Sequence, residues 1–331
     1  MNRIKGKRVL VTGGAGFIGS NICVDLVKDN EVVCLDSFIT GKRENLESLK
    51  NNSKFNLIEG DIRNEKDCQK ALQGVDIVLH QAALGSVPRS IENPILTNSI
   101  NIDGFLMMLN QSQKMGVKRF VYAASSSTYG DHPGLPKIEE NIGSPLSPYA
   151  VTKYVNELYA KVFFDLHGME VIGLRYFNVF GRHQDPDGAY AAAIPKFIKA
   201  FLSGAAPTVH GDGEQSRDFT YIENVLQANH LAAITENKLA IGEVFNVAFG
   251  DRTTVNELTS ALRANLTKFD ASISNIEINY VAERKGDVKH SLASIEKAQS
   301  LLNYNPQFSL EKGLDEAINW YFEYFKNKAH V

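Results

Sequence analysis

The glycine-rich stretch VTGGAGFIGS constrains the fold of this chain most strongly. Gly13, Gly16 and Gly19 follow the apolar run RVLVTG and open a helical pattern, and Asp36 ends the next apolar run, EVVCLD. A tight turn from a buried strand into a helix, followed by an acidic residue after the second strand, is typical of a dinucleotide-binding unit whose helix N-terminus holds a pyrophosphate. A plain strand–helix turn that uses glycine only for tightness is the alternative.

The alternation of strand and helix patterns continues through the first 180 residues. Short apolar runs separated by helical patterns predict buried parallel strands with right-handed crossovers, and therefore an α/β fold with a Rossmann-type doubly wound parallel sheet. The predicted strands are 8–13, 31–36, 55–61, 75–82, 118–125 and 170–177, and the main predicted helices are 16–28, 95–115 and 148–166.

The pattern breaks after Asn178, and no linker-like stretch separates the two halves. A helix near 192–204, a helix within 218–233 and a strand at 243–250 follow. We expect a nucleotide-binding domain made of 1–177 plus 218–250, and a smaller interleaved mixed α/β substrate domain made of 178–217 plus 251–331. The crevice between two such domains is the natural ligand site.

Composition excludes several other classes of protein. The 331 residues are 44% hydrophobic and 22% charged, and the net charge of -3 gives no reason to expect nucleic acid or a membrane as partner. The charged N-terminus with its short apolar run predicts neither a signal peptide nor a membrane span. Three cysteines without CxxC spacing, Cys23, Cys34 and Cys68, predict buried thiols in a reducing, cytoplasmic compartment, and no metal site is expected.

Several short pieces indicate which dinucleotide binds. Asp36 is able to accept hydrogen bonds from a ribose 2′-hydroxyl and would repel a 2′-phosphate, which favours NAD over NADP. Lys42 and Arg43 lie nearby and weaken that preference, although a solvated loop is their ordinary interpretation. Asp61 ends the third predicted strand, where a carboxylate meets an adenine amino group, and the small residues of HQAALGS let a cofactor lie close to the backbone.

Tyr149 and Lys153 lie four residues apart in SPYAVTKYVNEL, on one face of the predicted helix 148–166. A free phenol is a poor base because its pKa is about 10. A cation about 4 Å away lowers a pKa by roughly three units at an effective dielectric constant of ~20. We predict that Lys153 and an oxidised nicotinamide together lower the pKa of Tyr149 to near neutral pH, so that it acts as a general base. A buried aromatic beside a surface lysine is the alternative for an isolated YxxxK.

A serine cluster, Ser125, Ser126 and Ser127, follows the fifth predicted strand at its carboxyl end, where open α/β sheets bind ligands. A hydroxyl there is able to bridge Tyr149 and a substrate hydroxyl and to pass a proton between them. A serine-rich turn that caps backbone groups is the alternative.

Taken together, GxxGxxG, SSSTYG, YxxxK and RYFNVFG resemble the extended short-chain dehydrogenase/reductase family, and within it the nucleotide-sugar 4-epimerases, over about residues 7 to 325. The resemblance implies Ser125 as the catalytic hydroxyl, Tyr149 as the base and Lys153 as its helper. It implies cofactor contacts at Gly13, Gly16, Phe17, Ile18, Gly19, Asp36, Asp61, Ile62, Ala82, Asn101, Tyr149, Lys153 and Tyr176. It implies nucleotide contacts at Asn178, Arg217, Arg284 and Asp287.

The resemblance also narrows the substrate. Dehydratases of the family carry an Asp-Glu pair directly after the catalytic hydroxyl residue, where this chain has Ser126 and Ser127. Epimerases that prefer plain hexoses carry a tyrosine four residues after the aspartate of their RxGD motif, where this chain has Ser291, which leaves room for an N-acetyl group. Further sugar-pocket residues are expected at Gly85, Ser86, Gln184 and Ala192. The piece GRHQDPDGAYAAAIPKF resembles bacterial UDP-N-acetylglucosamine 4-epimerases of surface polysaccharide (O-antigen, lipopolysaccharide) synthesis.

The expected reaction is therefore redox-neutral interconversion of UDP-N-acetylglucosamine and UDP-N-acetylgalactosamine. Tyr149, helped by Ser125, takes the proton of the sugar 4-hydroxyl, and C4 passes a hydride to tightly bound NAD and receives it back on the other face of a 4-keto sugar. The UDP part stays in place while the sugar turns over.

Three alternatives remain at this point. The first is a UDP-glucose/UDP-galactose or UDP-uronate 4-epimerase. The second is a dTDP-sugar oxidoreductase. The third is a non-catalytic nucleotide-sugar sensor, whose sign would be loss of Tyr149 or Lys153. The resemblance further implies a homodimer through a four-helix bundle of helices 95–115 and 148–166, although Leu106, Met107 and Met108 also fit an ordinary core.

Overall fold

The computed structural model describes residues 2–187, 192–283 and 289–328, and its centre is a parallel sheet. Within these residues seven strands pair in the order β11-β6-β5-β4-β1-β2-β3, and every pairing is parallel. The order reverses beside β1, which is the topological switch point of a doubly wound sheet. The strands are β1 (Arg8–Thr12), β2 (Glu31–Asp36), β3 (Phe55–Glu59), β4 (Ile77–His80), β5 (Arg119–Ser125), β6 (Glu170–Tyr176) and β11 (Val244–Val247).

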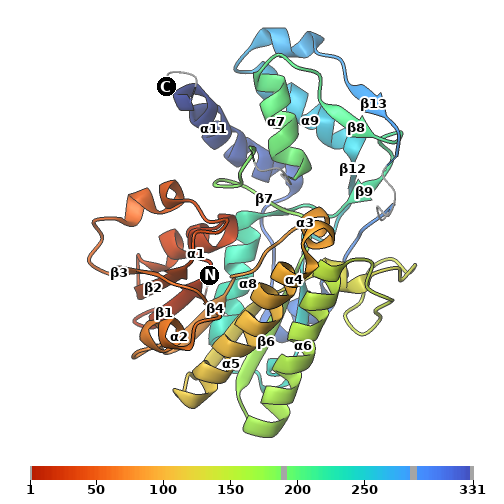
Figure 1. Cartoon of the computed structure of the whole chain (residues 1–331). Coiled ribbons are helices and arrows are strands. Elements are labelled where there is room, and N and C mark those ends of the chain that lie inside the picture. Colours follow the sequence, from red (N-terminus) through yellow and green to blue (C-terminus); the bar gives the residue numbers. More distant parts are fainter. Residues whose placement is uncertain (1, 188–191, 284–288, 329–331) are drawn as a thin grey trace.

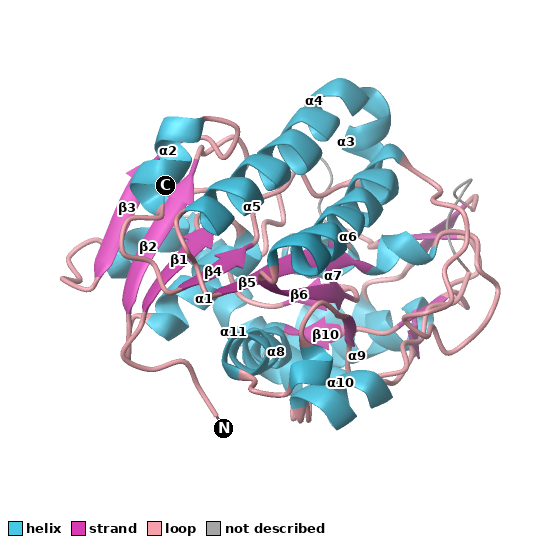
Figure 2. Cartoon of the chain, turned by 90° about the horizontal axis from the view of Figure 1, so that it is seen from below, coloured by secondary structure: helices cyan, strands magenta, loops and turns pink. Residues whose placement is uncertain are grey.

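Alternate residues of each strand feed two hydrophobic cores. Val9 and Val11 belong to the core under α1 (Phe17–Leu26) and α8 (Ile222–Ile234), whereas Leu10 belongs to the core on the other face. That second face carries the helices drawn above the sheet in Figure 2. They are α2 (Glu65–Ala71), α5 (Gly104–Lys114) and α6 (Pro148–His167). The predicted Rossmann-type fold is confirmed.

Two predicted elements differ from the observed ones. The helix predicted at 95–115 consists of α4 (Pro94–Asn98), a π-helical turn η2 (Ser99–Asp103) and α5, with α3 (Val87–Glu92) before it. The segment 218–233 begins with the short strand β10 (Thr220–Tyr221) before α8 starts. Side-chain periodicity does not distinguish a π-helical turn from an α-helix over five residues, so the sequence pattern gave one long helix.

The helix that carries Tyr149 and Lys153 has clear boundaries. Ser147 caps it by accepting a hydrogen bond from the Ala150 amide at 3.1 Å, and Pro148 occupies the first helical position. Gly168 ends it in the left-handed conformation. These signals fix the start of α6, and with it the position of the catalytic candidates at the carboxyl end of β5.

The second half of the chain forms a smaller group of elements beyond the carboxyl edge of the sheet (Figure 1). Helix α7 packs on α9 and α11, and their apolar residues belong to the same core as α1 and α8. The predicted domain boundaries stay a prediction. The elements are β7 (Val179–Phe180), α7 (Ala193–Leu202), β8 (Thr208–His210), β9 (Ser216–Arg217), β12 (Thr253–Thr254), α9 (Val255–Thr267), η5 (Ala271–Asn275), β13 (Asn279–Val281) and α11 (Leu310–Lys328). Helix α10 (Glu296–Leu302) instead packs on β11 and α8. The other short 3₁₀ helices of the described residues are η1 (Arg43–Leu49), η3 (Ser126–Tyr129) and η4 (Lys238–Ala240).

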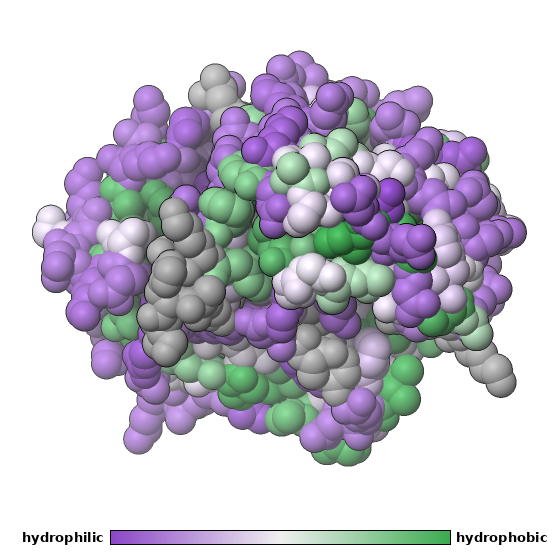
Figure 3. Space-filling model, turned by 90° about the horizontal axis from the view of Figure 1, so that it is seen from above, coloured by the Kyte–Doolittle hydropathy of each residue, from purple (hydrophilic) through white to green (hydrophobic). Residues whose placement is uncertain are grey.

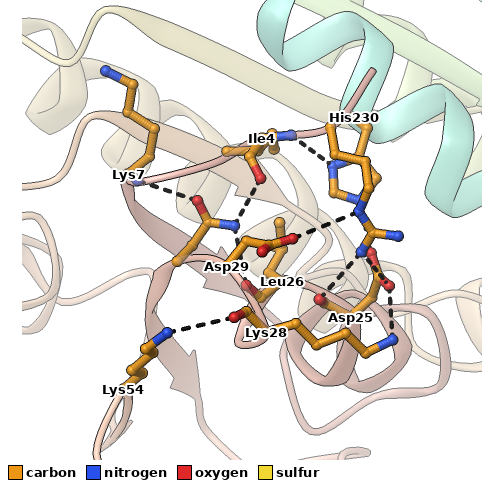
Figure 4. A network of polar contacts seen from close by, with 10 residues as sticks. Ile4, Lys7, Asp25, Leu26, Lys28, Asp29, Lys54 and His230 are labelled. Carbon is orange, nitrogen blue, oxygen red and sulfur yellow. Dashed lines mark hydrogen bonds and ion pairs between the residues drawn. The ribbon is translucent and has the colours of Figure 1, made fainter. Parts of the chain in front are cut away.

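A buried polar network joins the N-terminal segment to α1 and α8 (Figure 4). The Ile4 amide donates to Nδ1 of His230 at 3.2 Å, so the imidazole proton lies on Nε2, which donates to Asp25 at 2.6 Å. Burial raises the pKa of the Asp25 carboxyl, but hydrogen bonds from His230 and Arg3 outweigh it and hold that pKa well below its usual value. The network fixes α8 against α1 behind the ligand edge of the sheet.

The surface and the cysteines agree with a globular protein. The three cysteines are buried free thiols, as predicted. The face in Figure 3 is mostly hydrophilic, with a smaller group of apolar residues near its centre. Among the described residues, no helix combines the length and apolarity that crossing a bilayer requires.

Candidate active site

The turn between β1 and α1 has the geometry that its glycines predict. Gly13 has φ +67°, and a Cβ there would lie 2.7 Å from the Ala82 backbone. A Cβ on Gly19 would lie 2.1 Å from the Gly13 carbonyl oxygen, so the helix packs directly on the turn. Gly16 caps α1 without any side-chain hydrogen bond. The amides of the first turn are therefore open to an anionic ligand, which fits a pyrophosphate.

The carboxylates predicted to hold the cofactor lie at successive strand ends. Asp36 is buried and accepts the amides of Ala15 and Phe38, both at 2.8 Å. Burial raises the pKa of Asp36, and these hydrogen bonds oppose the rise. Asp61 pairs with Arg63, which holds the pKa of that carboxyl below its usual value.

The nearby cations are occupied by other carboxylates. Lys42 pairs with Asp185 at 2.7 Å, and Arg43 pairs with Glu59 at 2.5 Å. This pairing leaves Asp36 as the charged group beside a bound ribose, which supports NAD over NADP.

A cavity of about 430 Å³ runs along this edge of the sheet. It is lined by most of the residues that the sequence predicts for the cofactor, together with the catalytic candidates and one sugar-pocket residue. These are Gly13, Gly16, Phe17, Ile18, Gly19, Asp36, Asp61, Ile62, Ala82, Gly85, Ser125, Tyr149, Lys153 and Tyr176.

The catalytic candidates meet at one end of this cavity. Lys153 is buried, and its Nζ donates to the Ala123 carbonyl at 2.8 Å and lies 6.0 Å from the centre of the Tyr149 ring. The Ser127 hydroxyl donates to Ser125 Oγ at 2.9 Å. A phenol, an ammonium and a hydroxyl held together beside a dinucleotide cavity form a site for proton transfer coupled to hydride transfer.

Burial shifts the pKa values of both catalytic candidates. Burial raises the pKa of Tyr149, and a hydrogen bond with Ser125 opposes the rise. Burial also lowers the pKa of Lys153 to about 8, against the pull of Glu157. Lys153 alone therefore does not lower the pKa of the Tyr149 phenol to near neutral pH. The predicted shift therefore relies on the second positive charge, that of an oxidised nicotinamide, and stays a prediction.

Two further cavities adjoin the first. One of about 620 Å³ shares Ser125 with it and is lined by Ser126, Ser127 and Ser291 among others. Another of about 480 Å³ is lined by Gln184 and Ala192. Asn178 and Arg217 line both of these. The first and third cavities also share Val179, so the three cavities adjoin one another.

Two predicted residues that the structure describes, Asn101 and Ser86, do not line these cavities. Asn101 is buried and does not line the cavities; it accepts the Leu84 amide at 2.8 Å and donates to Thr152 at 3.1 Å, so it fixes the loop after β4 to α6. Its direct contact with the cofactor stays a prediction. Ser86 caps α3 by accepting the Arg89 amide. Arg284 and Asp287 lie outside the described residues.

A triangle behind the cofactor cavity was missed by the sequence interpretation. The Tyr176 hydroxyl donates to Gln81 Oε1 at 3.2 Å and accepts from Asn229 Nδ2 at 2.9 Å, and Gln81 donates to Asn229 Oδ1 at 3.3 Å. Gln81 follows β4 directly, so its place at a strand end was a signal. Asn229 lies on α8, and nothing in the sequence pairs it with Tyr176.

Asp218 was also missed. It is buried beside Arg217 and accepts the backbone amides of Phe249, Gly250 and Ala293 at 3.1 to 3.2 Å. Burial raises its pKa to about 7, against those hydrogen bonds. The carboxyl thereby holds the segment after Ser291 next to Arg217, at the far side of the serine cluster.

The sequence model of the "NAD dependent epimerase/dehydratase family" matches residues 9–248. The chain belongs to this family. Its relatives cover nearly its whole length. A "putative UDP-glucose 4-epimerase" of Methanocaldococcus jannaschii is 37% identical over 94% of this chain and 97% of that protein.

Solved structures of the family are close in shape. A UDP-N-acetylglucosamine 4-epimerase from Methanobrevibacter ruminantium M1, in complex with UDP-N-acetylmuramic acid, has a TM-score of 0.91 at 40% identity and covers 97% of this chain and 100% of its own. A UDP-glucuronic acid 4-epimerase from Bacillus cereus, in complex with UDP-glucuronic acid and NAD, has a TM-score of 0.87 at 34% identity and covers 96% and 99%.

The family, the fold and NAD as cofactor are thereby confirmed as predicted from the sequence. These relatives are nucleotide-sugar 4-epimerases, which is the enzyme class predicted for this chain. The individual site residues stay predictions.

Proposed function

We propose that this protein is a UDP-sugar 4-epimerase that interconverts UDP-N-acetylglucosamine and UDP-N-acetylgalactosamine. One observation carries the proposal: Ser125, which lies beside Tyr149 and Lys153, lines both the dinucleotide cavity and the adjoining cavity. A sugar in the second cavity therefore faces the proton-transfer residues and the cofactor at once.

Bound NAD supplies the acceptor and donor of the hydride at C4 of the sugar. The residues of the chain handle the proton and the geometry. Tyr149 accepts the proton of the 4-hydroxyl through or beside Ser125, and the Lys153 ammonium stabilises the resulting phenolate. The Ser127 hydroxyl orients Ser125 by donating to it at 2.9 Å. Arg217 and Asn178 lie where the second and third cavities meet, and hold the diphosphate there.

The N-acetylated substrate is favoured by the residues around the sugar. Ser291 lines the second cavity with a small side chain, and Ser126 and Ser127 leave no carboxylate of the kind a dehydratase uses. The 40% identity to a UDP-N-acetylglucosamine 4-epimerase supports the same substrate. A UDP-uronate is the second candidate, because a UDP-glucuronic acid 4-epimerase is 34% identical. Arg284 and Asp287 are proposed to complete the nucleotide site.

Proton NMR of the anomeric signals tests this function. Purified protein with UDP-N-acetylglucosamine and no added cofactor is expected to form UDP-N-acetylgalactosamine, and Tyr149→Phe is expected to abolish the change. Conversion of UDP-glucose alone would overturn the substrate assignment. No conversion of either sugar with NAD supplied would overturn both of these substrates and bring the uronate forward.

The homodimer is proposed from one exposed apolar stripe. Val151, Leu158, Val162 and Leu166 project from α6 with 45% to 73% exposure, and their spacing places them on one side of the helix. Ile95 on α4 is 80% exposed. A four-helix bundle with a second copy would cover this stripe, whereas Met108 belongs to the core. We also propose that the protein is cytoplasmic and that it acts in the synthesis of surface polysaccharides.

A further inference from the structure

Lys137 is a buried cation without a carboxylate partner. Its side chain belongs to a residue only 4% exposed, and its Nζ donates to the His132 carbonyl. Within the described part of the chain it has no ion pair and no other side-chain hydrogen bond. Burial alone lowers its pKa, and no carboxylate opposes the effect. Buried ammonium groups are normally paired, because leaving their donors unsatisfied is unfavourable.

The unpaired N–H donors belong to a residue that lines a cavity. Lys137 lines the 620 Å³ cavity together with Ser125, Ser127 and Ser291. An ammonium group has three N–H donors, and His132 takes one of them. Two donors are therefore without a described partner, on a residue that lines the cavity proposed to hold the sugar.

The backbone of Lys137 is fixed against the segment that follows Ser291. Its amide donates to Leu292 at 2.7 Å, its carbonyl accepts the Ser294 amide at 2.9 Å, and it pairs with Ala293 in a parallel bridge. The backbone of Lys137 therefore lies beside the segment that follows Ser291, and both residues line the same cavity. A backbone fixed in this way reduces the entropy that the residue loses on binding a ligand.

We infer that Lys137 is a specificity-determining residue that donates a hydrogen bond to the acetamido carbonyl oxygen of the substrate. The inference rests on the proposed function and names a contact within it. A plain hexose offers only a hydroxyl at this position, which is a weaker acceptor than an amide carbonyl, so the lysine favours the N-acetylated substrate over UDP-glucose. A carboxylate on the sugar has the same acceptor chemistry. Glu92 lines the same cavity, which makes a neutral carbonyl the better match.

The test is direct binding, which does not depend on turnover. Lys137→Met keeps the length of the side chain and removes its donors. Isothermal titration with UDP-N-acetylglucosamine, UDP-glucose, UDP-glucuronate and UDP is made in the Tyr149→Phe background, so that no substrate is converted. Lys297→Met is the matched control, because Lys297 pairs with Glu140 and Glu243 and does not line the cavities.

We expect Lys137→Met to weaken binding of UDP-N-acetylglucosamine by about 10- to 100-fold, the range for a charge-assisted hydrogen bond. Binding of UDP-glucose and UDP should change less than about threefold, and Lys297→Met should change none of them. Unchanged UDP binding shows that the variant is folded.

A merely structural lysine would weaken all ligands alike or lower the melting temperature with affinity unchanged, and either result overturns the inference. A loss confined to UDP-glucuronate would assign the lysine to a carboxylate and overturn the acetamido contact. Failure of the proposed function would give a different result: the unmodified protein would bind these ligands and convert none of them.

Discussion

The buried ion pair between Arg175 on β6 and Glu157 on α6 gives the sharpest stability prediction. Arg175 donates from Nε and Nη2 to the two carboxylate oxygens at 2.9 and 2.8 Å, and the side chains are 4% and 6% exposed. Its Nη1 donates to the Glu139 carbonyl at 2.9 Å. When one partner of such a pair is removed, the other stays buried with its charge uncompensated.

We expect Glu157→Gln, which preserves size, to lower the free energy of unfolding by about 3–5 kcal/mol. Urea unfolding followed by circular dichroism measures it, at equal NAD occupancy because bound cofactor stabilises the folded state. Glu59→Gln is the control, since its ion pair with Arg43 is about 60% exposed on both sides and contributes less than about 1 kcal/mol. A loss for Glu157→Gln no larger than the control's would refute the reasoning.

The same variant tests the electrostatics of catalysis. Glu157 raises the pKa of Lys153, which burial lowers to about 8. Lys153 is charged below its pKa, so removing the Glu157 charge should let the ammonium lose its proton at lower pH. We expect the alkaline limb of kcat against pH to move toward neutrality in Glu157→Gln. If the alkaline limb stays at the same pH, the protonation of Lys153 does not determine that limb.

Four other expectations follow from single features. Burial raises the pKa of Asp218 to about 7, above the ordinary value of about 3.9, so the native protein should lose stability relative to Asp218→Asn as pH rises between these values; a difference constant with pH in denaturant titrations contradicts this. Asp36→Asn should narrow the preference for NAD over NADP by about tenfold, measured by cofactor titration, and an unchanged ratio would remove Asp36 from cofactor choice. Ser291→Tyr should abolish turnover of UDP-N-acetylglucosamine while sparing UDP-glucose in coupled assays, and equal loss of both would contradict the pocket assignment. Leu158→Glu with Val162→Glu should yield a monomer by light scattering, whereas a persisting dimer would place the interface elsewhere.

The sheet was predictable because its strands are short apolar runs with sharp ends. Each predicted strand of the sheet matches an observed one within a few residues, since turn glycines and strand-end aspartates mark where burial stops. The second half was harder. Its strands β7, β9, β10 and β12 have two residues each, too few to produce any periodicity.

The site was predictable where one local motif carried it. Tyr149 and Lys153 share a helix face, and the glycine turn is continuous in sequence, so both could be found from spacing. Lys137 and Asn229 could not, because their significance comes from strands and helices that meet only in the folded chain. Spacing also does not show burial, which raises the pKa of Tyr149, so the predicted lowering by Lys153 and oxidised nicotinamide together stays a prediction.

The central claim is that C4 of the sugar loses and regains the same hydride on a retained cofactor. The most direct measurement is the reaction of UDP-N-acetylglucosamine in D₂O with no added NAD, followed by NMR of the product. We expect UDP-N-acetylgalactosamine that keeps its full complement of protium at C4. Deuterium at C4 or C5 of the product would contradict hydride return and require a solvent-exchanged carbanion instead.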